Sequence, residues 1–388
     1  MVHNTYQICT RCIMDTSDPW IFFDENGVCY HCLHFDAKMR DWNDEDKLTA
    51  TLSEIIHKVK KSSENNEYDC VIGLSGGIDS SYLAYIVKRQ FGLRPLAVHL
   101  DNGWNSKLAV KNIEHIIRKL DIDLHTHVVD WEEFRDIQIS YIKASVIDIE
   151  AITDHAIIGC LFQTAVENNI KCIMLGTNDV TERILPRAWV FNKNDARNLL
   201  SIHRRFGTLP IKTYPLLGAA TLKMYISRIG IEVFSPLNYV SYIKSQAKQV
   251  LINELGWIDY GGKHYESIFT RFYQGYILPR KFHVDKRRAH FSTLINSGQM
   301  TREQALEELK LPPYPLEMQK QDYDYVLKKL GFTAEEFEEL MSLPIKSHFD
   351  YATDLKSKIS YKIYPRLYRW YPYLQPIYKQ VKRLIPFA

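Results

Sequence analysis

The stretch from Tyr68 to Gly92, YDCVIGLSGGIDSSYLAYIVKRQFG, constrains the fold of this chain more than any other. Residues 68–74 are too apolar for a half-exposed strand and are typical of a central parallel strand covered on both faces. A glycine-bearing turn follows directly. Beyond Asp79 the apolar residues recur at helical spacing until Gly92, which predicts a helix end. The stretch therefore predicts a strand, a loop and a helix.

The loop between this strand and helix is suited to binding a phosphate. Gly76 and Gly77 let the backbone approach an oxyanion closely. Hydroxyl groups of Ser75, Ser80 and Ser81 join the amides of the helix N-terminus as donors. The loop lacks the spacing and the lysine of a Walker phosphate loop and the GxGxxG pattern, so a Walker-type phosphotransferase is not predicted. A glycine turn that opens an ordinary Rossmann-like helix is the bland alternative.

Further apolar runs continue the alternation of strands and helices. Arg94 to Leu100 and Leu124 to Val129 predict two strands, which flank a helix from Asn105 to Leu120. Ile170 to Leu175 predicts a fourth strand. Right-handed crossovers would place these strands in one sheet, with Asp101 at the edge where open α/β proteins bind ligands. We therefore expect a doubly wound, mostly parallel α/β sheet, with a mainly helical C-terminal region.

Two C-x2-C knuckles near the N-terminus predict a metal site. Their cysteines are Cys9, Cys12, Cys29 and Cys32. Sixteen residues separate the knuckles, a spacing that closes a tetrahedral thiolate zinc site. Four thiolates leave the zinc no open position, so a structural module is favoured over a catalytic or redox role. His31 and His34 lie nearby but are not needed, and an iron–sulfur cluster uses the same ligands.

From Tyr214 the sequence loses its alternation of strands and helices, and a polar, aromatic segment from about Tyr239 to Thr301 predicts the substrate region. Gly261 and Gly262 predict a tight turn before Lys263, and Arg271 is expected on the helix that follows. The segment's cationic cluster is Lys281, Lys286, Arg287 and Arg288. Such a cluster suits a diphosphate, a carboxylate or RNA phosphates, although a solvated basic helix face is the alternative.

The predicted domain organisation has four parts. They are a zinc module (1–45), a nucleotide-binding domain (46–240), a helical substrate-binding region (241–345) and a basic, Tyr-rich tail (346–388). Thr301 and Thr333 predict the N-caps of two helices. From Tyr361 onward the tail has six basic residues and no acidic one, so contact with a membrane surface or a partner competes with a docked or disordered tail.

The loop sequence SGGIDS resembles the pyrophosphate loop of the ATP pyrophosphatases, a family of adenylating ligases that includes NAD and GMP synthetases and tRNA thiolases. In that family the loop holds the pyrophosphate released when ATP is cleaved between its α and β phosphates. GTNDVTE, at residues 176–182, resembles the element that lies across the crevice from this loop. The implied ATP-binding residues are Ser75, Gly76, Gly77, Asp79, Ser80, Ser81, Asp101, Gly176, Thr177 and Asn178.

Two roles follow from the same resemblance, and the polar segment from Tyr239 to Thr301 completes the predicted site. Asp79 and Glu182 become candidate ligands of the Mg²⁺ that bridges the phosphates of ATP. Asp101 becomes a candidate for recognition of the ribose or adenine, with a plain turn as the alternative. The candidate catalytic residues are Ser75, Asp79, Lys263 and Arg271. The candidate substrate-binding residues are Lys263, His264, Arg271, Lys281, Arg287 and Arg288.

A more specific resemblance covers roughly residues 6–340. The motifs CTRC, DTSDPW, CYHC, SGGIDSS, VHLDNGWNS, GTNDVTE and YGGKHYESIFTRF together resemble the N-acetyl sugar amidotransferases. The resemblance implies that ATP, Mg²⁺ and ammonia convert the acetamido group of a nucleotide-linked N-acetyl sugar into an acetamidino group. The expected product enters O-antigen, other lipopolysaccharide or flagellin glycans.

The source of ammonia is predicted to lie outside this chain. An N-terminal glutaminase needs a cysteine at position 2, where this sequence has Val2. Neither Cys70, Cys160 nor Cys172 lies in the glycine context of a nucleophile elbow. The resemblance supplies a separate glutaminase subunit, with a cyclase-like barrel partner that conducts the ammonia.

Composition sets broad limits on the function. The formal charge of +3 does not by itself argue for nucleic acid, and no nucleic-acid partner is expected. No apolar run approaches the length of a bilayer span, so the chain is expected in the cytoplasm. A tRNA thiolase is the first alternative, disfavoured because Cys160 and Cys172 are twelve positions apart rather than in a C-x-x-C pair. A non-catalytic scaffold is the second.

Overall fold

The structure is a computed structural model that describes residues 5–40, 44–354, 356–359 and 361. Its centre is a five-stranded sheet of the order β3-β2-β1-β4-β5, in which every neighbouring pair is parallel. The strands are β1 (Cys70–Gly73), β2 (Pro95–Asp101), β3 (Asp123–Val128), β4 (Cys172–Met174) and β5 (Glu232–Phe234). The strand order reverses direction between β1 and β4, and this is where open α/β sheets have their ligand crevice.

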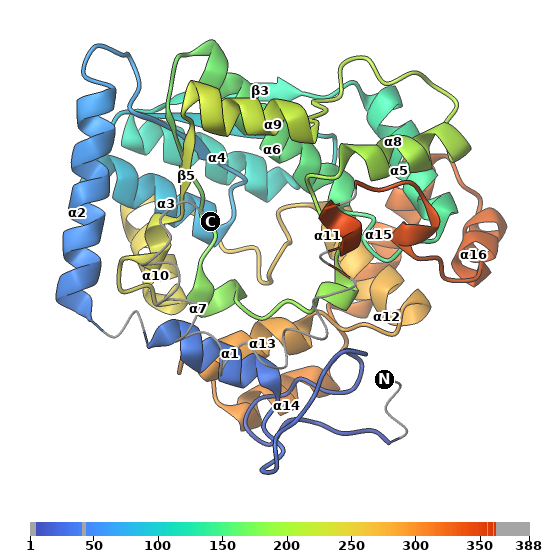
Figure 1. Ribbon diagram of the computed structural model, residues 1–388. Helices are drawn as coiled ribbons and strands as arrows, with labels where there is room; N and C mark the ends of the chain where they lie inside the picture. Colours follow the sequence, from blue (N-terminus) through green and yellow to red (C-terminus); the bar gives the residue numbers. More distant parts are fainter. Residues whose placement is uncertain (1–4, 41–43, 355, 360, 362–388) are drawn as a thin grey trace.

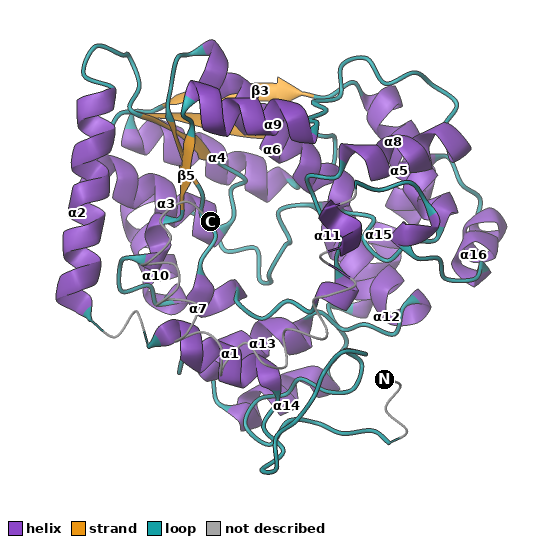
Figure 2. Ribbon diagram, in the orientation of Figure 1, coloured by secondary structure: helices purple, strands orange, loops and turns teal. Residues whose placement is uncertain are grey.

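Helices and the loops that connect them surround this sheet (Figures 1 and 2). The helices of the N-terminal half are α1 (Tyr30–Met39), α2 (Glu45–Ser62), α3 (Ile78–Tyr85), α4 (Lys107–Leu120), α5 (Trp131–Ala144), α6 (Ala151–Glu167), α7 (Asp179–Glu182) and α8 (Ala196–Phe206). Those of the C-terminal half are α9 (Ala219–Met224), α10 (Lys244–Leu255), α11 (Ile268–Phe272), α12 (Leu278–Lys281), α13 (Arg287–Asn296), α14 (Arg302–Lys310), α15 (Leu316–Leu330) and α16 (Ala334–Ser342).

Alternation along the central strand explains the two layers of helices. Cys70 and Ile72 of β1 share one buried core with α3, α4 and α10, while Val71 shares another with α6 and the helix that begins with α9. All three side chains are fully buried, as the apolar run predicts. The prediction of a doubly wound parallel sheet is therefore confirmed, and its four predicted strands correspond to β1 to β4.

The predicted loss of strand and helix alternation from Tyr214 was wrong in one respect, because β5 follows at the edge of the sheet. This strand has only three residues, and Val233 is 43% exposed, so no buried run marks it in the sequence. In addition, α10 lies beyond the predicted boundary at residue 240 but packs on α3, with Leu251 in the core that contains Ile72.

A separate apolar core supports the C-terminal half. It joins α5, α11, α15 and α16 through buried side chains such as Phe134, Phe272, Val326 and Phe337. The predicted caps Thr301 and Thr333 each form a capping box, which confirms the starts of α14 and α16. Among the described helices, none is both long enough and apolar enough to cross a bilayer.

Candidate functional site

The predicted pyrophosphate loop leads from β1 into α3 with a backbone that only small residues allow. Gly76 has a φ of +79°, and a Cβ atom there would lie 2.6 Å from the carbonyl oxygen of Ala109. The amide of Gly77 donates to Ser75 Oγ over 3.2 Å, and the hydroxyls of Ser75 and Ser80 lie 3.0 Å apart. The loop therefore presents a compact group of hydroxyls and amides beside the N-terminus of α3.

The second predicted element, GTNDVTE, lies directly against this loop. A Cβ atom on Gly176 would come within 3.0 Å of the backbone of Asp79 and Ser80. Asn178 caps α7 and donates to Asp79 Oδ1 over 3.3 Å. The carboxyl ends of β1 and β4 thus bring the two motifs together, although roughly a hundred residues separate them in the chain.

A cavity of about 2360 Å³ opens at this edge of the sheet. Of the predicted ATP-binding residues, those that line it are Ser75, Gly77, Asp79, Ser80, Gly176, Thr177 and Asn178. Gly76, Ser81 and Asp101 do not line it. The carboxylate of Asp101 accepts hydrogen bonds from the amide of Gly103 and from Asn105, at 2.9 and 3.1 Å, which is the plain turn that the sequence left as an alternative.

Alternating charges surround the loop, and we call this part of the cavity the phosphate end (Ser75, Gly77, Asp79, Glu182 and Lys263). Asp79 accepts a hydrogen bond from Tyr242 Oη at 2.5 Å, and burial together with the nearby Glu182 charge raises the pKa of its carboxyl. Lys263 Nζ lies 3.0 Å from Glu182 Oε1. Burial opposes ionisation of Glu182, but the Lys263 ammonium outweighs it and lowers the pKa of that carboxyl.

These groups fit a magnesium ion that carries ATP phosphates. Mg²⁺ is usually bound by one or two carboxylates together with substrate phosphates and water, and Asp79 and Glu182 supply two carboxylates on one cavity wall. Lys244 also lines this wall, and among the described residues its ammonium forms no hydrogen bond or ion pair. Cations on both sides of the carboxylates suit a polyphosphate.

The predicted substrate-binding residues separate into two groups. Those that line the cavity are Lys263, His264, Arg271 and Arg287. Arg271 is held in place by Asp322 through two hydrogen bonds of 2.7 Å, and Arg287 is paired with Asp285.

The structure places the other two away from the cavity. Lys281 is 9% exposed and donates to the carbonyl oxygens of Leu340, Met341 and Leu343, so it stabilises the end of α16. Arg288 contacts the N-terminal module through the carboxylate of Asp15 and the carbonyl of Ile13, both at 3.0 Å. The predicted cationic cluster therefore does not act as one surface, because its members face different neighbours.

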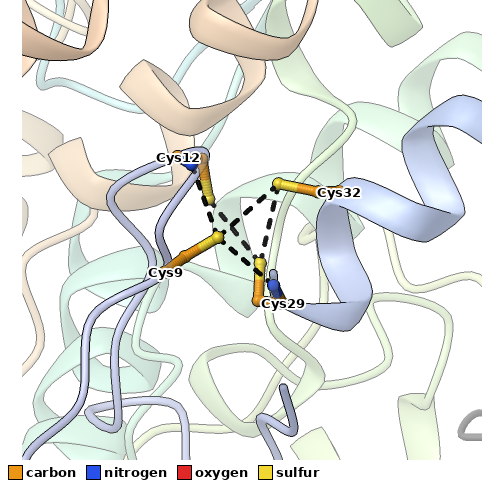
Figure 3. A group of neighbouring side chains, drawn as sticks. All are labelled: Cys9, Cys12, Cys29 and Cys32. Carbon is orange, nitrogen blue, oxygen red and sulfur yellow. Dashed lines mark hydrogen bonds between the residues drawn. The ribbon is translucent and has the colours of Figure 1, made fainter. Parts of the chain in front are cut away.

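The four N-terminal cysteines converge on one point (Figure 3). Their sulfur atoms are 3.9 Å apart for Cys9 and Cys32, 3.6 Å for Cys12 and Cys29, and 3.8 Å for Cys29 and Cys32. Sulfurs about 3.8 Å apart are what a tetrahedral ion with bonds of about 2.3 Å requires. Backbone amides of Cys12 and Cys29 donate to Cys9 Sγ, as is usual for thiolates. The cysteines could therefore hold a single zinc ion.

The cysteine module is connected to the phosphate end through α13. Asn296 of α13 donates to Cys32 Sγ, and Ser292 of the same helix accepts from the amide of Ile13. Arg302, the first residue of α14, donates to the carbonyls of Cys9 and Cys12. On its other side α13 packs on α7, where Thr293 Oγ1 accepts from the amide of Ile184. Figure 1 shows α1, α13 and α14 together below the sheet, with α7 above them. The module thus supports the helix that carries Glu182.

A second group of charged and polar residues lines another part of the cavity, which we call the Glu150 end (Glu150, Asp154, Lys193, Thr270 and Lys286). Thr270 Oγ1 donates to Glu150 Oε2 over 2.6 Å, and Lys193 Nζ lies 3.1 Å from Asp154. In the sequence, Asp154 stands at the head of an apolar helix, where an aspartate is usually interpreted as a helix cap, and nothing there singled out Glu150 or Lys193. A carboxylate pair just before and inside the first turn of an otherwise apolar helix was the available signal.

Two family models match different parts of the chain. A model for NAD synthase matches residues 48–188, and a model described as the C-terminal domain of LPS biosynthesis protein WbpG-like matches residues 266–368. The first covers β1 to β4 with the pyrophosphate loop, and the second begins at Glu266, which lines the cavity.

Among curated proteins, an uncharacterized protein of Methanocaldococcus jannaschii is 27% identical over 117 residues, 30% of this chain and 40% of that protein. A glutamine-hydrolyzing GMP synthase of Thermosipho africanus is 33% identical over 98 residues, 25% of this chain and 18% of that enzyme. This chain spans less than half the length of these relatives. An NH3-dependent NAD synthetase from Campylobacter jejuni, solved with nitrate, matches at 17% identity and a TM-score of 0.33, over 69% of this chain and 98% of that one.

Proposed function

We propose that this chain is an ATP-dependent amidotransferase of surface-glycan biosynthesis, because it joins a pyrophosphate-loop domain of the NAD synthase type to a WbpG-like C-terminal domain. Its substrate is a nucleotide-linked N-acetyl sugar, whose acetamido oxygen is adenylated and then replaced by ammonia. The products are an acetamidino sugar, AMP and pyrophosphate. The observation that carries this proposal is the contact between the loop at Asp79 and the element at Gly176 across one cavity, flanked by Glu182 and Lys263.

Adenylation solves a chemical problem that an amide poses. Resonance leaves the amide carbon a weak electrophile, so ammonia does not displace its oxygen unaided. When the amide oxygen attacks the α-phosphorus of ATP, the bond to the β-phosphate breaks and pyrophosphate leaves. Ammonia then attacks the activated carbon, and the C–O bond breaks with its electron pair remaining on AMP. Both steps need positioned phosphates and cations rather than a protein nucleophile.

The residues of the phosphate end suit the first step. Amides and hydroxyls around Ser75 and Gly77 would bind the departing pyrophosphate, and Lys263 would neutralise charge that develops on it. Asp79 and Glu182 would hold Mg²⁺, which when bound shields the phosphate charges. Arg271, fixed by Asp322, would meet the sugar nucleotide rather than act on ATP.

Ammonia is proposed to come from a separate glutaminase subunit with a cyclase-like partner, and zinc is the proposed occupant of the cysteine site. The thiolase alternative is weakened by the three remaining cysteines, Cys70, Cys160 and Cys172. All are buried, none lines the cavity, and burial raises the pKa of Cys160 and of Cys172 to about 12. Such thiols are poor sulfur carriers.

The test is to incubate the purified chain with ATP, Mg²⁺, ammonium chloride and UDP- or CMP-linked diacetamido sugars. We expect AMP to form only with a sugar present, and the sugar to lose about one mass unit as oxygen is exchanged for NH. Glutamine should not replace ammonium in the isolated chain. AMP formation that depends on tRNA and a sulfur donor, with none on any sugar, would contradict the proposal and favour the thiolase.

A further inference from the structure

Glu150 stands immediately before α6. Glu150 is only 8% exposed, yet it is one of the residues that line the cavity. The Thr270 hydroxyl holds one carboxylate oxygen at 2.6 Å, while among the described residues the other oxygen has no hydrogen-bond partner. A carboxyl group with one oxygen anchored and one free is fixed in orientation and can still accept a proton.

The charges that face Glu150 come from several elements. Asp154 lies one turn along α6, and Lys193 approaches from the loop before α8, where it bridges Asp148 at 2.5 Å and Asp154 at 3.1 Å. Lys286, just before α13, has its ammonium nitrogen 5.7 Å from the ring centre of Tyr273, and within the described part of the chain this ammonium forms no ion pair or hydrogen bond. Burial and Asp154 favour a neutral Glu150, whereas Thr270, Lys193 and Lys286 favour its ionised form.

These opposing influences tune Glu150 for proton transfer. Burial raises the pKa of its carboxyl to about 7, although the Thr270 hydrogen bond lowers it. A base is most effective when its pKa lies near the working pH, because it is then ionised and can also release its proton again. Among the described residues no ion pair engages the Glu150 carboxylate, whereas Glu182, which lines the same cavity, is paired with Lys263.

One short segment connects Glu150 to the phosphate end. Lys263 reaches Glu182, and seven positions later Thr270 reaches Glu150. Between them, Glu266 accepts from the amide of Ser106, in the loop that follows β2, through its backbone carbonyl. Thr153 of α6 lies 3.5 Å from Asn102 of the same loop. Substrate bound along this segment would touch both ends of the cavity at once.

We propose that Glu150 accepts the proton from the nitrogen that attacks the activated sugar, an inference that rests on the proposed function. The nitrogen lone pair forms the new C–N bond, and the nitrogen, now positively charged, gives one proton to the Glu150 carboxylate. The C–O bond to AMP breaks and its electron pair stays on the AMP oxygen. Glu150 later releases the proton to water in the cavity. Lys286 is the nearby cation that offsets the charge of Glu150 between turnovers.

The test separates the two chemical steps in the full chain. Adenylation is followed as exchange of labelled pyrophosphate into ATP, with a UDP- or CMP-linked diacetamido sugar and no ammonium. Amination is followed as amidine formed at a constant concentration of free ammonia from pH 6 to 9. We expect Glu150→Gln to keep pyrophosphate exchange within about twofold and to lose about a hundredfold in amination, the usual contribution of a general base.

The pH profile adds a readout that a structural role would not change. Wild-type amination should rise through about pH 7 as Glu150 ionises, and Glu150→Gln should lack this rise. Glu167→Gln is the matched control, because Glu167 ends the same helix at an exposed position. Circular dichroism verifies the fold of each variant.

The outcomes distinguish this inference from the function on which it rests. If wild type shows no sugar-dependent exchange, the proposed function fails and the inference fails with it. If wild type shows exchange but Glu150→Gln aminates like wild type, or loses exchange and amination equally, only the role of Glu150 is overturned. Loss of amination alone, together with loss of the rise near pH 7, supports it.

Discussion

At the phosphate end of the cavity, one continuous loop and one element across the crevice supply amides, hydroxyls and carboxylates that hydrogen-bond to each other. At the Glu150 end, by contrast, α6, α11 and the segments before α8 and α13 each contribute one or two side chains. Carboxylates at the first end are paired, Asp79 with Tyr242 and Glu182 with Lys263. Glu150 keeps one oxygen free. The first end is built to hold charge in place, and the second to let a proton move.

The largest effect should come from the phosphate end. Asp79→Ala removes a carboxylate that accepts hydrogen bonds from Asn178 of the GTNDVTE element and from Tyr242. We expect AMP formation to fall by about a thousandfold or more, since groups that stabilise transition-state charge contribute on that scale. Sugar-dependent pyrophosphate exchange measures it.

Ser75→Ala should also lower the rate of AMP formation. Asp101→Asn should lower it only slightly, because Asp101 stabilises a turn outside the cavity. Fold and zinc content should be unchanged in all three variants. Exchange that survives Asp79→Ala would contradict the assignment of the phosphate end and revive the scaffold alternative.

The difference between the two ends also explains what the sequence could predict. The phosphate end was predictable because its groups lie in two short stretches, where glycine and serine spacing reports a local backbone shape. The parallel sheet was predictable because β1 is a continuous apolar run. Only the edge strand β5 was missed, since three partly exposed residues leave no pattern.

The Glu150 end could not be predicted in this way. Its side chains lie as far apart in sequence as Glu150 and Lys286, and only the folding of α6, α11 and α13 brings them together. Asp154 was interpreted as a cap, although it forms an ion pair with Lys193. The same limit applies to Lys281 and Arg288, whose positive charges were visible but whose carbonyl and carboxylate partners were not.

The next prediction concerns the cysteine module and asks whether both ends of the cavity depend on it. The cysteine module holds α13, which packs on α7 at the phosphate end and follows Lys286 at the other. Cys12→Ala should release the metal, lower the melting temperature and reduce both exchange and amination by about ten- to a hundredfold, because small displacements of reacting groups have effects of that size.

Zinc content by atomic emission and thermal melts provide readouts that do not rely on activity. Cys160→Ala is the matched control, since Cys160 is buried in α6 and lies outside the one group of possible metal ligands found among the described residues. It should keep its zinc and both chemical steps. If Cys12→Ala lost zinc but kept normal exchange, α13 would not need the module to position α7.

The smallest effect concerns the free energy of unfolding. The pKa of Glu150 is about 7 in the folded chain, compared with an ordinary value of 4.5. Below pH 4.5 the group is protonated in both states and has no effect on stability. As pH rises from about 4.5 to about 7, the unfolded chain loses this proton more readily, so the folded state becomes less stable. Above pH 7 the group is ionised in both states, and the folded state becomes no less stable as the pH rises further.

Glu150→Gln should therefore be more stable than wild type at pH 8 by about 1–3 kcal/mol, and about equally stable at pH 4.5 or below. The pKa difference already includes the attraction of Lys193 and Lys286 for the carboxylate, and it sets the upper limit of this gain. Urea unfolding at both pH values measures it, with Glu167→Gln as the control that should differ little at either. A Glu150→Gln variant less stable than wild type at pH 8 would mean that this carboxylate stabilises the fold. A gain in stability together with a loss of amination is what a residue retained for proton transfer should show.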